Sequence, residues 1–165
     1  MIQQLDRAEA ERLVNTYSDL ILRLSYTYLK NTQDAEDICQ TVFLKLLTSG
    51  QTFDSPAHEK AWIIRATANA CKDTMRNAFR RRTVALEAVA ETPAPMAPEN
   101  DVLEAVMALP ENYREAVYLY YYEGYSVREI AGLLGRSESA VTAHLSRGRQ
   151  KLRMTLGGNG YEQSV

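Results

Sequence analysis

The side chains that could do chemistry in this sequence gather near its C-terminal end. Five basic residues and one acidic residue lie between Arg136 and Arg153. Small and polar side chains, at Ser139, Thr142 and Ala143, precede most of that basic run. A helix of this kind fits the major groove of DNA, because its first turns reach base edges while Arg and Lys neutralise phosphates. The residue types therefore predict contact with duplex DNA.

A pair of short helices must position these side chains. Ser126 and Glu129 have the spacing of a capping box, which begins a helix, and Gly135 suits the left-handed conformation that ends one. Ser137 then caps the next helix. The buried faces are predicted to be Val127, Ile130, Ala131 and Leu134 in the first helix, and Val141, Leu145 and Leu152 in the second. The order predicts a helix-turn-helix over residues 126–153.

The residues of this motif predicted to contact DNA are Arg136, Ser137, Ser139, Ala140, Thr142, Ala143, Ser146, Arg147, Arg149 and Lys151. The alternative is an amphipathic helical hairpin whose cationic end only complements the helix dipole.

Charge is strongly partitioned along the chain, although the net charge is only −2. Residues 60–82 hold seven basic residues and one acidic residue, whereas residues 83–112 hold six acidic residues and no basic ones. Local field governs the attraction of phosphates, so the two basic segments outweigh the net charge as an indicator of a nucleic-acid partner.

Apolar spacing predicts an all-α fold of two small helical domains joined by a flexible linker. One helix is expected from Leu13, a second from an N-cap at Asp34 to Ser49-Gly50, and a third from Ser55-Pro56 towards Arg82. Residues 1–82 form the first domain, and residues 83–100, with three of the five prolines from Thr92 to Glu99, form the linker. Residues 101–156 form the second domain, in which a helix opens at residues 109–111 and closes at Gly124, and residues 157–165 are a frayed tail.

Several classes of site and protein are disfavoured. Cys39 and Cys71 share no metal-type spacing with each other or with His58 and His144, so buried thiols are expected rather than a zinc or redox site. No metal and no cofactor is predicted. Clustered carboxylates and a phosphate-cradling glycine loop are lacking, which argues against a nuclease or a phosphotransferase. No stretch is long and apolar enough to insert in a membrane and no leader pattern opens the chain, so a cytoplasmic protein is expected.

Two sets of motifs, in order along nearly the whole chain, resemble the sigma-70 family of bacterial transcription initiation factors, and within it the small extracytoplasmic-function (ECF) group. Residues 34–46 (DAEDICQTVFLKL) are similar to the polymerase-binding helix of the second sigma region, and residues 61–69 (AWIIRATAN) with 80–82 (RRR) to its promoter-melting segment. Residues 109–117 (LPENYREAV), 124–131 (GYSVREIA) and 141–153 (VTAHLSRGRQKLR) resemble the fourth region.

The resemblance implies a protein that binds core RNA polymerase, recognises promoter DNA at its minus-35 and minus-10 elements and helps to open the duplex. An anti-sigma factor is an expected partner. The second helix would dock on a basic partner helix through acidic residues with an apolar anchor, namely Asp34, Glu36, Asp37, Gln40, Phe43 and Leu44. An ordinary solvated helix face is the alternative reading of that set.

The basic segment of the first domain would track a single promoter strand, with one base held out of the stack. Its predicted contacts are Arg65, Asn69, Lys72, Arg76, Asn77, Arg80, Arg81 and Arg82. Trp62 and the tyrosines between Tyr118 and Tyr125 are expected to lie mainly in the core, with part of the tyrosine cluster as a second candidate polymerase contact.

The chain departs from the family pattern at Thr142, where relatives often have a lysine, and after Asn69, so promoter preference does not carry over from relatives. A rival function is an autonomous helix-turn-helix repressor or activator with a sensing N-terminal half. The basic segment at residues 60–82 disfavours it, because a ligand sensor needs no such strip.

Overall fold

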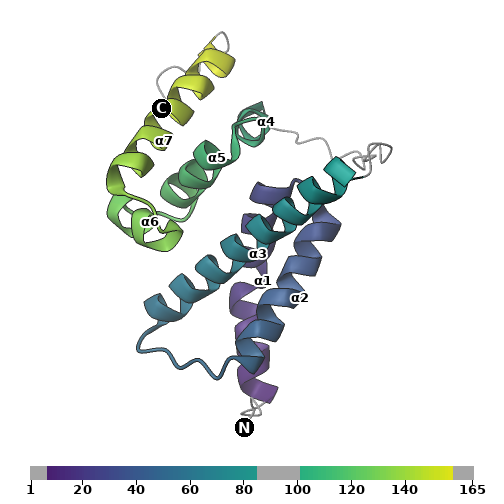
Figure 1. Cartoon of the computed structure of the whole chain (residues 1–165). Helices are drawn as coiled ribbons and strands as arrows, with labels where there is room; N and C mark the ends of the chain where they lie inside the picture. Colours follow the sequence, from purple (N-terminus) through teal and green to yellow (C-terminus); the bar gives the residue numbers. More distant parts are fainter. Residues whose placement is uncertain (1–6, 85–100, 158–165) are drawn as a thin grey trace. The chain divides into compact units, whose positions relative to one another are not determined.

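The computed structural model describes residues 7–84 and 101–157, and in these ranges every regular element is helical. The chain divides into two compact units, Met1–Pro93 (unit 1) and Ala94–Val165 (unit 2). The prediction of an all-α, two-domain fold is confirmed (Figure 1). The predicted linker and tail lie outside the described residues, apart from the ends of the flanking helices and Gly157.

Unit 1 is built from three helices, α1 (Arg7–Leu29), α2 (Thr32–Thr48) and α3 (Pro56–Val84). α1 packs against both α2 and α3, and α2 also contacts α3. The core between them is aliphatic, and its most deeply buried side chains are Ile21, Leu24, Val42, Ile63 and Ile64. Burial of such side chains stabilises each by about 1.5–3 kcal/mol relative to exposure.

The ends of α2 and α3 follow from side-chain caps. The predicted cap of α2 at Asp34 is wrong: Asn31 caps the helix, and its Oδ1 accepts a hydrogen bond from the Asp34 backbone N–H at 3.0 Å. Asp34 thus lies in the first turn, where a carboxylate complements the helix dipole. Ser55 begins α3 as predicted, because its Oγ accepts from the His58 N–H at 3.1 Å and Pro56 follows.

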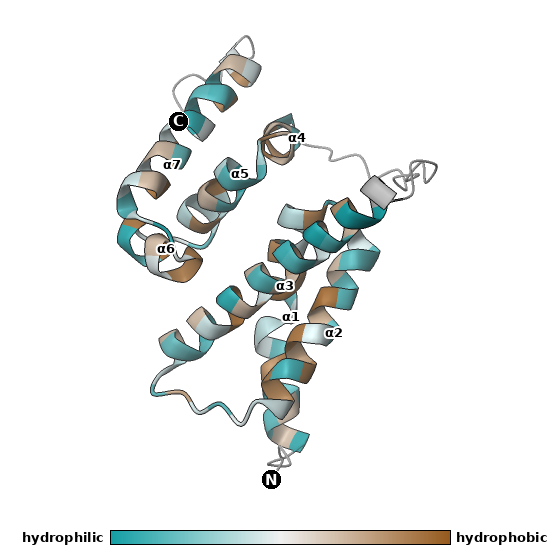
Figure 2. Ribbon diagram, in the orientation of Figure 1, coloured by the Kyte–Doolittle hydropathy of each residue, from teal (hydrophilic) through white to brown (hydrophobic). Residues whose placement is uncertain are grey.

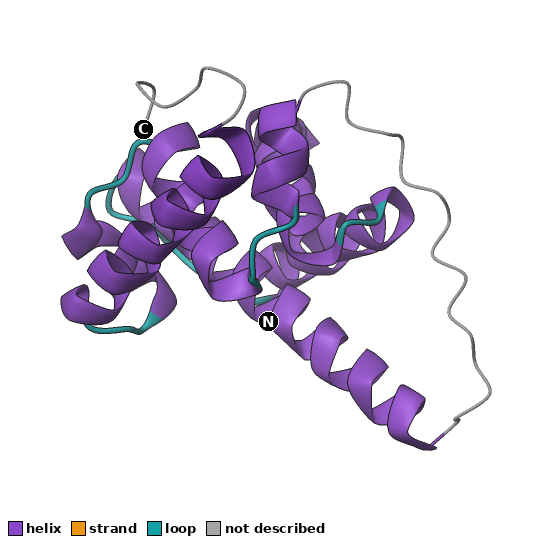
Figure 3. Ribbon diagram, turned by 90° about the horizontal axis from the view of Figure 1, so that it is seen from above, coloured by secondary structure: helices purple, strands orange, loops and turns teal. Residues whose placement is uncertain are grey.

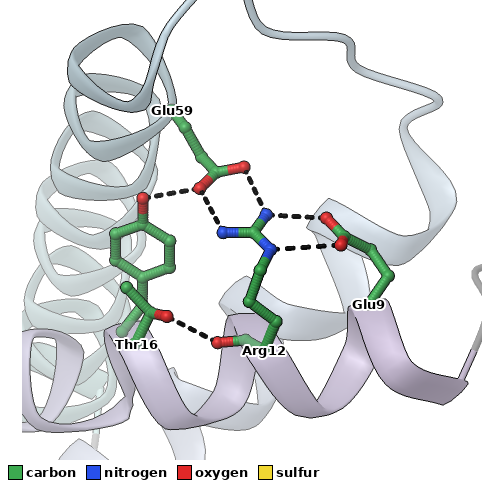
Figure 4. A network of polar contacts seen from close by, with 5 residues as sticks. Glu9, Arg12, Thr16 and Glu59 are labelled. Atoms are coloured by element: carbon green, nitrogen blue, oxygen red, sulfur yellow. Dashed lines mark hydrogen bonds and ion pairs between the residues drawn. The ribbon is translucent and has the colours of Figure 1, made fainter.

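A buried carboxylate joins the beginnings of α1 and α3 (Figure 4). Glu59 accepts hydrogen bonds from Arg12 Nη1 at 3.1 Å, from Arg12 Nη2 at 2.9 Å and from the Tyr17 hydroxyl at 2.6 Å. Arg12 also donates to the exposed Glu9 on the preceding turn, at 2.6 and 3.1 Å. The network satisfies a carboxylate that would otherwise be costly to bury, and it fixes one end of α3.

The other end of α3 leaves the packed core. Among the side chains of α3 that are described, Cys71 is the last buried one, and from Lys72 to Arg81 every side chain is at least partly exposed. These C-terminal turns are mainly hydrophilic (Figure 2) and extend past the other helices of unit 1 (Figure 3). The side chains of residues 82–84, Arg82 included, lie outside the description.

Unit 2 contains α4 (Asp101–Met107), α5 (Glu111–Val117), the π-helical turn η1 (Tyr118–Tyr122), α6 (Val127–Leu134) and α7 (Glu138–Leu156). α7 packs against α4, α5 and α6. Gly148 allows a close approach to α5, since a Cβ there would lie 3.1 Å from Val117 Cγ2. The helix predicted to run from residue 109 to Gly124 is interrupted by the π-helical turn η1, which changes the faces on which its tyrosines lie.

None of the helices in the described ranges has the length and hydropathy needed to cross a membrane.

Replacing Glu59 with glutamine removes the charge that pairs with Arg12 and weakens the acceptor of the Tyr17 hydroxyl. We expect the free energy of unfolding of unit 1 to fall by about 1–3 kcal/mol at pH 7, the range for losing a partner of buried or charged groups. Trp62 is the only tryptophan of the chain and belongs to unit 1, so its fluorescence in a urea titration follows this unit.

The pH dependence gives a second check. The hydrogen bond from Arg12 holds the pKa of Glu59 below its ordinary value of 4.5, and the Tyr17 hydroxyl lowers it further, against the opposing effect of burial. A lowered carboxyl pKa stabilises the fold fully above about pH 4.5 and loses that effect as the pH falls through the folded value. The deficit of Glu59→Gln should therefore shrink in acid. The matched control is Glu11→Gln, from an exposed pair with Arg7, and equal deficits in the two variants would contradict the assignment.

Candidate nucleic-acid interface

The helix-turn-helix has the local geometry that the sequence predicts. Ser126 Oγ accepts from the Glu129 N–H and Glu129 Oε1 accepts from the Ser126 N–H, both at 3.1 Å, which completes the capping box. Gly135 ends α6 with φ +64°, a conformation that glycine adopts without strain. Ser137 caps α7, and its Oγ accepts from the Ala140 N–H at 3.0 Å. The predicted motif over residues 126–153 is confirmed as α6, a glycine turn and α7.

The buried faces of α6 and α7 hold the pair together. Val141, Leu145 and Leu152 of α7 are buried as predicted, and Leu156 continues their row. On α6, Ile130 and Ala131 are buried as predicted, but Leu133 is buried whereas Val127 and Leu134 are only half-buried. α6 packs against both α7 and η1, and helical spacing alone does not specify which of its apolar residues this packing buries.

The outward face of α7 carries most of the side chains predicted to contact DNA. Ser139, Thr142 and Ser146 are exposed at spacings of three and four, so they lie on one face. Arg147 and Lys151 are also exposed, and so is Ser137, the N-cap residue of α7. The methyl groups of Ala140 and Ala143 are half-buried, which leaves them only an apolar contact to offer. Such a face presents polar groups near the N-terminus of α7 and cations after them.

Gln150 continues this face and was not predicted from the sequence. It is exposed and lies four residues after Ser146. The amide of glutamine can pair with adenine in the major groove, so Gln150 extends the set of candidate base contacts. The i, i+4 spacing from Ser146 could have identified it.

Two of the predicted DNA contacts are engaged within unit 2. Arg136 Nη2 lies 2.9 Å from Glu115 Oε1 and donates to Asn112 Oδ1 at 2.9 Å, while the Glu115 side chain is completely buried. Arg149 Nη1 donates to the Tyr121 hydroxyl at 3.0 Å. Arg136 is thus held by a buried carboxylate at the turn of the motif, and Tyr121 orients the guanidinium of Arg149 beside α7. Their contact with DNA stays a prediction.

The pKa of His144 is affected by both members of the Arg136–Glu115 ion pair. Burial lowers the pKa of His144 from 6.5, and the nearby Arg136 and Arg147 lower it further, whereas Glu115 opposes the shift. The ring of Tyr113 packs against the imidazole with a centroid distance of 5.7 Å.

The tyrosines of η1 differ from the prediction that they lie mainly in the core. Tyr118 and Tyr125 are half-buried, but Tyr121 is 51% and Tyr122 60% exposed, and Tyr120 is also exposed. Tyr118 stacks on Tyr122 with ring centroids 5.2 Å apart, so the exposed rings form an ordered surface. The i→i+5 hydrogen bonds of the π-helical turn shift these side chains away from the 3.6-residue pattern on which the prediction rested.

The predicted strand-tracking residues of unit 1 form a stripe along α3. Arg65, Asn69, Lys72, Arg76 and Arg80 follow one another at spacings of three and four, so they share a face. All of them are exposed except Lys72, which is half-buried with its ammonium 5.9 Å from the centre of the Tyr28 ring. Arg76 forms an ion pair with Asp73 one turn earlier. Asn77 and Arg81 are exposed on the flanks of this cationic stripe, and the Arg82 side chain is not described.

Trp62 lies at the beginning of α3, half-buried against the edge of the Phe53 ring, 6.0 Å between centroids. This contact supports the predicted structural role. Cys71 is fully buried, and burial raises the pKa of the half-buried Cys39 thiol, so neither has the environment of a reactive thiolate.

The exposed face of α2 combines carboxylates with an apolar side chain. Asp34, Glu36, Asp37 and Gln40 are exposed, as the prediction requires. Leu44, four residues after Gln40, is 62% exposed, whereas Phe43 is half-buried at the edge of the core. The geometry favours Leu44 over Phe43 as the apolar centre of this face, with Leu47 exposed next to it.

Two family models match this chain, one in each of its two units. Residues 13–82 match the family model of sigma-70 region 2, and residues 99–152 match that of sigma-70 region 4. The ECF sigma factor SigM of Mycobacterium tuberculosis is 30% identical over 155 residues, which cover 92% of this chain and 79% of that protein. The chain belongs to the ECF group of the sigma-70 family.

Other relatives are longer than this sigma factor. SigE of Mycolicibacterium smegmatis, also an ECF sigma factor, is 33% identical over 163 residues, which cover 92% of this chain but 63% of SigE. The probable sigma factor RfaY of Xanthomonas campestris is 30% identical, and the match covers 88% of this chain and 40% of RfaY. The chain therefore spans less than two thirds of the length of these two relatives.

Solved structures show the same fold. The sigma factor RpoE of Bartonella quintana, crystallised in complex with the anti-sigma factor NepR, superposes with a TM-score of 0.74 at 22% identity, covering 90% of this chain and 97% of RpoE. CnrH, in complex with the cytosolic domain of CnrY, superposes with a TM-score of 0.65 at 22% identity, covering 94% and 92% of the two chains. At this level of identity the likeness is one of fold.

Substituting Arg136 with methionine removes the guanidinium that lies 2.9 Å from the buried Glu115 carboxylate. We expect the free energy of unfolding of unit 2 to fall by about 3 kcal/mol or more, the cost of removing one partner of a buried ion pair. The double variant Arg136→Met with Glu115→Leu should recover most of that loss. Hydrogen exchange of the backbone amides of α5 and α7 measures both effects.

Arg153→Met is the matched control, since Arg153 is an exposed arginine on α7, the helix that follows the turn. The pKa of His144, followed by NMR, should rise in Arg136→Met because a cation that lowers it is gone. Similar losses in the Arg153 and Arg136 variants, with an unmoved His144 pKa, would show that the pair does not hold the turn.

Proposed function

We propose that this sigma factor binds core RNA polymerase, recognises promoter DNA at two elements and assists strand opening. The observation that carries the proposal is the presence of two separate cationic surfaces of different design in one chain. α7 presents polar side chains and then cations on a helix-turn-helix, which suits the major groove of a duplex. The stripe on α3 offers cations and an amide along one exposed helix face, which suits a single strand.

In the proposed division of labour, unit 2 reads the minus-35 element and unit 1 the minus-10 element. Ser139, Thr142 and Ser146 are the proposed base contacts of α7, and Arg147 and Lys151 the phosphate contacts. On α3, Arg65, Arg76 and Arg80 hold phosphates while Asn69 offers its amide to an unpaired base edge. Strand opening follows because binding energy gained only with the separated strand shifts the equilibrium towards it.

The proposed polymerase contact is the exposed face of α2. Leu44 supplies an apolar anchor, and Gln40 one turn earlier and Asp37 two turns earlier place polar groups beside it. An interface with a small apolar centre and a charged rim fits a basic helix of the polymerase.

An anti-sigma protein is the third proposed partner. The solved relatives RpoE and CnrH are each bound to another protein, which in the case of RpoE is an anti-sigma factor. Cationic surfaces that must be exposed for DNA binding are open to inhibition by a protein that covers them.

Run-off transcription on a promoter library tests the function as a whole. The chain with core polymerase should start transcripts at defined promoters, and core polymerase without the chain should not. Transcripts that do not depend on the chain would overturn the proposal. Nanomolar binding of the chain alone to a duplex operator would instead indicate an autonomous regulator.

Charge reversal and truncation on α2 test the polymerase contact. Asp37→Lys and Leu44→Ala should each weaken binding to core polymerase by about tenfold or more, since loss of an interface anchor or a like-charge contact costs at least about 1.4 kcal/mol. Val14→Ala, an exposed aliphatic residue on α1 outside the proposed interface, is the matched control. Binding is measured by fluorescence anisotropy with labelled sigma factor. Equal affinities for Leu44→Ala and Val14→Ala would remove Leu44 from the interface.

The two proposed kinds of contact on α7 should respond differently to substitution. Thr142→Lys should change which minus-35 sequences are preferred in the run-off library, because Thr142 is a proposed contact to base edges. Lys151→Gln should weaken binding about equally for all sequences and reduce the slope of log affinity against log salt by about one. Altered preference in Lys151→Gln, or an unaltered preference in Thr142→Lys, would contradict the assignment.

A further inference from the structure

Phe79 is an exposed aromatic residue within the most basic segment of the chain. Its side chain is 68% exposed, and it lies on the part of α3 that has left the packed core. One exposed aromatic residue on a protein surface needs no explanation by itself. The position of Phe79 relative to the cationic stripe is the informative feature.

Phe79 shares a face with the cations of the stripe. It follows Arg76 by three residues and Lys72 by seven, so at 3.6 residues per turn it lies within about 60° of Arg76 and about 20° of Lys72 around the helix. The stripe from Arg65 to Phe79 spans about 21 Å at 1.5 Å per residue. That length corresponds to about six stacked steps of a DNA strand at 3.4 Å each.

A cationic track with an aromatic ring on the same face is the arrangement that binds single-stranded nucleic acid. The cations follow the phosphates, and a base stacks on the ring. In a duplex the bases are already stacked on both sides, so the ring could reach only a groove edge such as a thymine methyl. An unpaired base offers it a whole face, and the aromatic contact therefore favours the separated strand over the duplex.

The charges around Phe79 favour DNA as its occupant. Arg76, Arg80 and Arg81 are exposed within one turn of the ring, and Asp73, the one acidic residue of the segment 60–82, is paired with Arg76. An apolar protein partner would meet these cations around a single ring, whereas a nucleic-acid strand supplies both the phosphates and the base.

We propose that Phe79 is a stacking platform for an unpaired base, at the C-terminal end of the single-strand track of α3. The proposal deepens the proposed function, since it rests on unit 1 holding the opened promoter strand. It assigns Phe79 a part in discriminating separated from paired DNA, which the cations alone cannot do because phosphates are present in both.

The test uses the full chain at low salt, with fluorescence anisotropy on three probes of one sequence: a single-stranded 12-mer, the same strand with abasic sites, and its duplex. Phe79→Ala should weaken binding to the single strand by about fivefold or more, the low end of the range for a base–aromatic contact. Binding to the abasic strand and to the duplex should change by less than about twofold, because neither offers an unpaired base face.

The choice of variants separates stacking from other effects. Phe79→Tyr should retain the affinity for the single strand, and Phe79→Leu, apolar but without a ring, should lose it. Arg76→Gln should weaken all three probes alike, since it removes a phosphate contact. Val14→Ala, on α1, should bind as the wild type does.

Several outcomes overturn the inference: no binding of the single strand by the wild type, an unchanged affinity in Phe79→Ala, an equal loss on the abasic strand or the duplex, or full retention in Phe79→Leu. Run-off transcription by the wild-type chain with core polymerase distinguishes the two levels. If the chain supports transcription while Phe79→Ala binds strands normally, only the role of Phe79 fails. If the chain supports no transcription, the proposed function fails whatever the strand binding shows.

Discussion

The pairing of a buried carboxylate with an arginine fixes the geometry on which each unit depends. In unit 2 the completely buried Glu115 side chain lies 2.9 Å from Arg136, at the turn between α6 and α7, so the start of α7 is tied to α5. In unit 1 Glu59 accepts from Arg12 and Tyr17 and ties the beginning of α3 to α1. Each carboxylate is costly to bury without its cation, which makes each contact specific to one arrangement of the helices.

The cationic side chains fall into two groups, those bonded inside a unit and those that face outward. Arg12 and Arg136 neutralise carboxylates, and Arg114, itself buried, donates to the carbonyl of Leu109 at 2.8 Å and stabilises the turn between α4 and α5. The cations of the second group stand on α3 and α7, where the packed faces of those helices keep them pointing outward. A chain with a net charge of −2 thereby presents two local positive surfaces, because much of its acidic charge lies on other elements or is used inside.

The two cationic surfaces also differ in how far their helices are packed against the rest of the unit. α7 is packed along its length, down to Leu156, so its outward face is held rigidly for reading a groove. α3 is packed only as far as Cys71, and its last described turns carry Phe79 and the arginines away from the core. A rigid face suits a regular duplex, and a projecting helix end suits a strand that must be drawn out of one. The exposed tyrosines of η1, ordered by stacking and by the bond from Arg149, form a further surface beside α7.

The sequence by itself determined the features that depend on residues close together along the chain. The caps at Ser55, Ser126 and Ser137 and the turn at Gly135 follow from contacts within a few residues, and the buried row of α7 follows from helical periodicity. These predictions are confirmed. Asn31 and Asp34 could each cap a helix locally, so local contacts did not decide between them. In the structure Asn31 caps α2.

Only the tertiary structure decided which polar side chains turn inward. Nothing near Glu59 in the sequence reveals that Arg12, 47 residues away, will meet it, and Arg136 has the same local pattern as the cations that face solvent. The exposure of Tyr121 and Tyr122 likewise depends on a π-helical turn in a packed unit. The physical reason is that desolvation and pairing energies are set by helices brought together from distant parts of the chain, whereas capping and helical periodicity are set within one or two turns.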